Sequence, residues 1–198
     1  MEEVNSKILL CFNKEYSIAD YNKDFRQGNK KRIARFIFDR FKERYIEPFK
    51  KNKNKNGFSM MAVACLMIEA LESFYQGYEN TKNKSKDCFI TFFEHCDELK
   101  EFRGLEEDFY YHIRCGILHQ AETRDGWKIS RKKEFPLLNE KTRTINATKF
   151  LNQLEKYLIS YSEKLENSDN TADIWKKFEK KMAAIIENCQ EKPLMRTV

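Results

Sequence analysis

The chain has 198 residues, of which 41% are apolar and 34% are charged. An apolar share of this size excludes a wholly disordered protein, because it is enough to build a core. The net charge of +6, from 37 basic and 31 acidic residues, permits a nucleic-acid partner without requiring one.

The first 28 residues show no clear periodicity, and we expect them to form an N-terminal extension, 1–28. Residues 8–12 are apolar and are expected to pack on the body, since the run is too short for the core of a secretion signal. No run approaches the roughly 20 apolar residues that a membrane span needs. The six cysteines contain no CxxC pair, so a disulfide framework is not expected. We therefore expect a cytoplasmic protein with no membrane partner.

Residues 29–49 have the spacing of an amphipathic helix. Its apolar side is formed by Ile33, Phe36, Ile37, Phe41 and Tyr45. The opposite side is basic, and a Lys/Asn-rich loop at 50–57 follows. We interpret these cations either as an ordinary solvated face or as a stripe that contacts RNA phosphates. The candidate RNA contacts are Lys31, Arg32, Arg35, Lys50, Lys51 and Lys53.

Residues 58–76 are apolar on every side, which predicts the buried central helix of a bundle, ended by Gly77. Cys65 in this run is interpreted as a small buried apolar residue. Two carboxylates, Glu69 and Glu72, interrupt the run. Because a carboxylate in so apolar a helix is costly to bury alone, each must reach water or a cation.

Two further helices are predicted at about 85–100 and 105–121, with a break at 101–104. After residue 123 the pattern alternates, and the sequence predicts two short strands at 127–130 and 142–145. We expect them to form a small antiparallel β-hairpin insertion near 127–146 with a long connection.

Asn146 can cap a helix that extends to about residue 166. A linker at 167–170 precedes a last amphipathic helix, at about 171–188. The predicted fold class is therefore all-α, a helical bundle with one small β insertion.

The most informative segment contains Arg114, four intervening residues and His119, late in the fourth of the predicted helices. This resembles the signature of the HEPN superfamily, in which an Arg and a His are separated by four to six residues. The resemblance implies a HEPN-like helical domain over 29–166 with the insertion at 124–146, followed by a C-terminal helix and tail at 167–198. One position departs from the family pattern, because many members have a polar residue, often Asn, where this chain has Cys115.

The chemistry of the two residues can be argued directly. An imidazole has an ordinary pKa near about 6.5, so His119 can take or give the proton when an RNA 2′-hydroxyl attacks the adjacent phosphate. Arg114 can hold that phosphate and stabilise its growing charge. Neither role needs a metal or another cofactor. The resemblance further implies 2′,3′-cyclic phosphate products, a homodimer that joins two motifs, and a toxin or phage-defence role with an antitoxin or defence-system partner.

Helix geometry complicates this pairing. Five residues along an ideal α-helix rotate a side chain by about 140°, so Arg114 and His119 do not share a face. Either the helix loosens near Gly116, or the working pair forms across a dimer. The residues expected to support the pair are Tyr110 beside Arg114, Glu69 or Glu72 as a partner that orients Arg114, and Glu122 as one that orients His119.

Other interpretations stay open. Arg114 could form a structural salt bridge and His119 could interact with its helix C-terminus. A metal could use part of a stripe on the same helix, with His95 or Cys96, although about 16 Å of straight helix cannot converge on one ion. The stripe consists of Asp108, His112, Cys115 and His119. We expect no metal site, and the alternative function is a non-catalytic helical RNA-binding or protein-interaction module that acts as a dimer.

Overall fold

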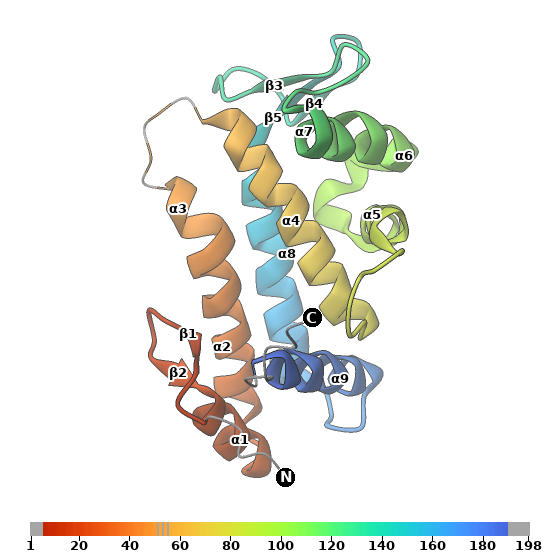
Figure 1. Cartoon of the computed structure of the whole chain (residues 1–198). Helices are drawn as coiled ribbons and strands as arrows, with labels where there is room; N and C mark the ends of the chain where they lie inside the picture. The colour runs from red at the N-terminus through yellow and green to blue at the C-terminus, as the bar shows by residue number, and fades with distance from the viewer. Residues whose placement is uncertain (1–5, 51, 53, 55, 190–198) are drawn as a thin grey trace, which may run out of the picture.

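The computed structural model describes residues 6–50, 52, 54 and 56–189, and this part of the chain is mostly helical (Figure 1). The helices of the bundle are α1 (Ile18–Arg26), α2 (Lys30–Phe41), α3 (Glu47–Lys50), α4 (Gly57–Gln76), α5 (Ser85–His95), α6 (Glu106–Asp108), α7 (Cys115–Gln120), α8 (Ala147–Asn167) and α9 (Asp173–Asn188). Two π-helical segments, η1 (Lys42–Ile46) and η3 (Phe109–Arg114), and one 3-10 helix, η2 (Asp97–Phe102), continue or connect them. The predicted all-α class with small β parts is confirmed.

Helix α4 is the central helix that the sequence predicted. It packs against α5, α8 and α9, and ends at Gly77, whose φ of 70° is left-handed. Cys65 is buried as predicted, and burial raises the pKa of its thiol to about 12. By length and composition alone α4 could cross a membrane, but 56% of its most apolar stretch is buried inside the bundle. This degree of burial is typical of the core helix of a folded domain.

The predicted helix at 29–49 contains a widened turn. Asn29 begins α2 by accepting a hydrogen bond from the Arg32 backbone N–H at 3.4 Å. The π-helical segment η1 then joins α2 to α3 without a break in the helical path. An extra residue per turn shifts every following side chain around the axis, which no apolar spacing had indicated.

The N-terminal segment packs on the body as expected. Strands β1 (Leu9–Cys11) and β2 (Tyr16–Ser17) form a small antiparallel pair that precedes α1. Leu10 and Cys11 are buried in the same apolar core as Met182 of α9. The core of the described residues therefore includes both the N-terminal extension and the last helix.

The expected antiparallel pairing of 127–130 with 142–145 is wrong. Strand β3 (Lys128–Ser130) runs parallel to β5 (Thr144–Asn146), and β4 (Leu138–Asn139) pairs antiparallel with β5, in the order β3–β5–β4. The connection between β3 and β5 is long enough to include a strand of its own. That strand occupies the hairpin position beside β5, so β3 takes the other edge and runs in the parallel direction.

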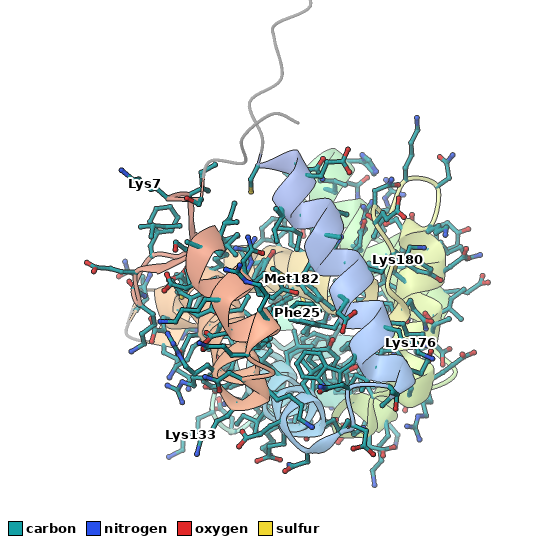
Figure 2. The ribbon with its side chains drawn as sticks, turned by 90° about the horizontal axis from the view of Figure 1, so that it is seen from below. Lys7, Phe25, Lys133, Lys176, Lys180 and Met182 are labelled. Carbon is teal, nitrogen blue, oxygen red and sulfur yellow. The ribbon has the colours of Figure 1, made fainter. Side chains whose placement is uncertain are left out.

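Helix α9 crosses the lower end of the bundle (Figure 1). Trp175 is buried and its indole N–H donates to the Leu165 carbonyl oxygen at 3.0 Å, which fastens α9 to the end of α8. Figure 2 shows Met182 on the side of α9 toward α1, and Lys176 and Lys180 on its other side; Met182 is buried. Gly77 lets α9 approach closely, because an added Cβ there would lie 2.9 Å from the Lys177 Cα.

Candidate functional site

The helix that carries the Arg/His motif changes its geometry at Arg114. Residues up to Arg114 are π-helical in η3, and α7 continues from Cys115 as an α-helix. The backbone therefore loosens before Arg114 and not near Gly116. Gly116 instead makes room for the returning chain, since a Cβ there would lie 2.6 Å from the Glu122 carbonyl oxygen.

The Arg114 side chain is 18% exposed and lies between two of its expected neighbours. Its guanidinium is 3.4 Å from a Glu69 carboxylate oxygen and 5.5 Å from the centre of the Tyr110 ring. Glu69 is itself held by the hydroxyls of Thr81 at 2.7 Å and Ser85 at 2.9 Å. A carboxylate that is fixed by two hydroxyls can orient the guanidinium of Arg114. The other N–H donors of this guanidinium then stay available for a phosphate.

Glu72 does not contact Arg114. It is fully buried and accepts hydrogen bonds from Gln76 at 2.8 Å and Thr91 at 2.7 Å. Its other carboxylate oxygen lies 2.7 Å from His95 Nε2, and the His95 ring stacks on Tyr75. Glu72 and His95 thus form a second carboxylate–imidazole pair, which the sequence analysis missed because only contact between α4 and α5 brings the two residues together.

His119 is exposed at the end of α7, and within the described part of the chain it makes no hydrogen bond, ion pair or ring contact. Glu122 does not orient it. The Glu122 carboxylate accepts instead from the Thr123 backbone N–H at 2.8 Å, because Ala121 adopts a left-handed φ of 55° that turns the chain away from the helix axis. The expected role of Glu122 is therefore corrected.

Arg114 lines a cavity of about 490 Å³ beside α4, hereafter the basic cavity. Besides Arg114, three cations lie on its walls: Arg40, Arg44 and Lys181. They come from α2, η1 and α9, which are far apart in the sequence, so local patterns could not indicate that they meet. His119 does not line this cavity.

The predicted RNA contacts lie elsewhere. Arg32 pairs with Asp24 at 3.1 Å and Arg35 with Asp39 at 2.8 Å, and together with Lys31 they line a separate cavity of about 470 Å³ between α2 and α8. Lys50 pairs with Glu155. Lys51 and Lys53 lie outside the described residues. None of the four described cations joins Arg114 in the basic cavity.

The side chains considered for an alternative metal site do not meet at one point. His112 Nε2 lies 3.9 Å from Asp108, whereas His95 is engaged by Glu72. The Cys96 thiol donates to Glu98 at 3.7 Å. Within residues 6–50, 52, 54 and 56–189, no three His, Cys, Asp or Glu side chains are grouped so that they could hold a metal ion.

Comparison with protein-family models, with curated proteins and with solved structures found no match to this chain. The resemblance to the HEPN superfamily therefore rests on the motif and on the helical context.

Proposed function

We propose that this protein is a HEPN-type, metal-independent endoribonuclease in which Arg114 binds the phosphate and His119 is the general acid/base. The observation that carries the proposal is the position of Arg114, on the wall of a cavity with three further cations. It lies one helical segment before the exposed His119, which has no partner among the described residues. Positive walls attract a phosphodiester, and an exposed imidazole can exchange protons with it.

The proposed reaction needs only these two side-chain types. The 2′-hydroxyl oxygen attacks the adjacent phosphorus while an imidazole takes its proton. The bond from phosphorus to the 5′-oxygen breaks, an imidazolium returns a proton to that oxygen, and a 2′,3′-cyclic phosphate remains. Arg114 stabilises the charge that develops on the phosphate oxygens.

A homodimer could bring an Arg114 and a His119 to the same phosphate. In one chain His119 does not line the basic cavity, so one motif alone does not present both groups to the same phosphate. Two copies would provide one imidazole as base and one as acid in a shared cleft. We further propose a cytoplasmic toxin or phage-defence role, in which an antitoxin or a defence-system partner controls the nuclease.

Cleavage of total RNA by the purified protein with a chelator present tests the proposal. His119→Ala is expected to lower the rate by about 100-fold or more, because general acid–base catalysis contributes that much. Gln120→Ala, a change at the next exposed position, should leave the rate unchanged. Matching melting temperatures would show that the variants remain folded, and full activity of folded His119→Ala would contradict the assignment.

A second function, a non-catalytic helical RNA-binding or protein-interaction module that acts as a dimer, has its own support. Arg114 already has a carboxylate partner in Glu69, as a structural salt bridge would, and Cys115 follows it in place of a polar residue. RNA binding without cleavage, weakened by Arg114→Gln and unaffected by His119→Ala, would favour this function over the nuclease.

A further inference from the structure

The basic cavity is walled by segments that are far apart in the sequence. Leu66 and Ala70 of α4 line it, together with residues of α2, η1 and α9. Its volume of about 490 Å³ is within the range of pockets that hold small molecules. The cavity is thus large enough for a compact ligand that reaches several walls at once.

Arg40 and Arg44 share a single neutral acceptor. Both guanidiniums donate to the Leu10 carbonyl oxygen, Arg44 at 3.3 Å. A guanidinium carries five N–H donors, so most of these donors are not used by that carbonyl. Arg44 also lies 3.7 Å from Glu43, but that carboxylate accepts the backbone N–H groups of Phe12 and Asn13.

Arg40 is short of negative charge. Within the described part of the chain, no carboxylate lies within ion-pair distance of it. Burial, together with the nearby Arg44 guanidinium, lowers the pKa of Arg40 to about 10. A shielded cation without a counter-ion is costly, and an anionic ligand in the cavity would remove that cost.

Lys181, from α9, likewise has no carboxylate within ion-pair distance among the residues that the structure describes. Its ammonium donates to the Glu79 backbone carbonyl at 3.1 Å, and burial lowers its pKa. The two carboxylates of the cavity are already engaged. Glu69 holds Arg114, and the Glu79 carboxylate lies 3.6 Å from Lys180, which does not line the cavity.

We infer that the basic cavity binds a phosphate monoester of mononucleotide size, with its phosphate held by Arg40, Arg44 and Lys181. A phosphate dianion carries the negative charge and the acceptor oxygens that the cations lining this cavity can bind. Leu66, which is 58% exposed at the cavity, offers an apolar surface to the body of the ligand. This binding needs no cleavage and no His119, so it goes beyond the proposed nuclease activity.

Calorimetric titration of the whole chain with adenosine monophosphate, inorganic phosphate and adenosine tests the inference. The monophosphate should bind at least about tenfold more tightly than adenosine, because each charge-assisted hydrogen bond to the phosphate adds about that factor. Inorganic phosphate should compete with it. A higher salt concentration should weaken binding of the monophosphate and leave binding of adenosine unchanged.

Two lysines of α9 give a matched pair of variants. Lys181→Gln should weaken binding of the monophosphate by at least about tenfold, whereas Lys176→Gln, which removes the same charge at an exposed position of α9 outside the cavity, should change it less than about twofold. Arg44→Gln should weaken it as well. Melting temperatures near that of the natural chain would show that each variant is folded.

Equal affinity for adenosine and its monophosphate, or equal losses in Lys176→Gln and Lys181→Gln, would overturn the site. Binding of a 5′-phosphorylated oligonucleotide about tenfold more tightly than the monophosphate would overturn the assignment to a small ligand. His119→Ala should keep full affinity for the monophosphate. A nuclease that fails to bind the monophosphate, and a monophosphate-binding protein that does not cleave RNA, are therefore distinguishable results.

Discussion

At the scale of single residues, Glu43 connects the N-terminal strands to the bundle. It accepts hydrogen bonds from the Asn13 backbone N–H at 2.9 Å, the Phe12 backbone N–H at 3.1 Å and the Cys11 thiol at 3.3 Å. Burial alone would raise the pKa of Glu43. These donors, with the nearby Arg44, outweigh burial and hold the pKa below its usual value.

Glu43→Gln should therefore lower the free energy of unfolding at pH 7 by about 2 kcal/mol, because an amide cannot accept all three bonds as strongly. The folded-state pKa is depressed, so this contribution is fully present above the unfolded pKa of about 4.3 and is lost as the pH falls through the folded value. Urea unfolding at pH 7 and pH 3 measures the difference. An equal difference at both pH values would contradict the assignment to the ionised carboxylate.

Gly116 is a position at which a close backbone contact leaves no room for a side chain. Ala at this position would place a Cβ 2.6 Å from the Glu122 carbonyl oxygen, and the chain that returns toward His112 would have to move. We expect Gly116→Ala to destabilise the protein by about 1–3 kcal/mol, as overpacking does. Leu118→Ala, at a residue 57% exposed on the same helix, is the control and should have a much smaller effect in thermal unfolding.

At the scale of elements, Asn146 joins the insertion to helix α8. Its side-chain oxygen accepts from the Lys149 backbone N–H at 3.2 Å, as the sequence predicted for a cap. Its amide nitrogen donates to the carbonyl oxygens of Lys132 and Phe135 at 2.8 and 3.2 Å, and the side chain is buried. One residue therefore both begins a helix and holds the long connection between β3 and β5.

Asn146→Ala should cost about 2–4 kcal/mol in denaturant unfolding, because it removes the cap and the hydrogen bonds that the amide donates to the Lys132 and Phe135 carbonyl oxygens. Asn146→Asp keeps a capping acceptor and loses the amide donor. The Asp variant should therefore recover only part of the loss, and full recovery would show that the bonds to Lys132 and Phe135 contribute nothing.

Helices were predictable where apolar spacing repeats over several turns. The helices at 57–76, 147–167 and 173–188 agree with the prediction to within one or two residues, because each buries a broad apolar side. The π-helical segments were not predictable, since one extra residue per turn leaves no local sign in the composition. The parallel pairing of β3 with β5 was missed because alternation identifies a strand without giving its partner.

At the scale of the whole molecule, the candidate site was predictable only in part. Tyr110 and Glu69 were expected beside Arg114 from spacing on one helix and from the need of a carboxylate for a cation, and both contact it. Arg40, Arg44 and Lys181 were missed, because their meeting depends on how α2 and α9 pack on α4. Contacts between segments far apart in the sequence leave no local pattern from which they could be predicted.

The close packing of α9 against the end of α4 depends on Gly77. Gly77→Ala would place a Cβ 2.9 Å from the Lys177 Cα and would force a side chain into a left-handed conformation with φ of 70°. We expect a loss of about 2–4 kcal/mol in unfolding free energy, as the sum of backbone strain and overpacking. Because α9 carries Lys181, the affinity for adenosine monophosphate should also fall, and unchanged affinity would show that α9 keeps its position.

Because α9 contributes Lys181 and Ile185 to the basic cavity, the order of synthesis decides when this cavity is complete. Ribosomes release the N-terminal part of a chain first, so α2, α4 and the Arg/His motif can assemble while residues beyond 173 are still being added. A nascent or truncated polypeptide that lacks Lys181 and Ile185 would have an open trough in place of the basic cavity. The ability to bind an anion there would thus arise late in translation, after the Arg/His motif has been made.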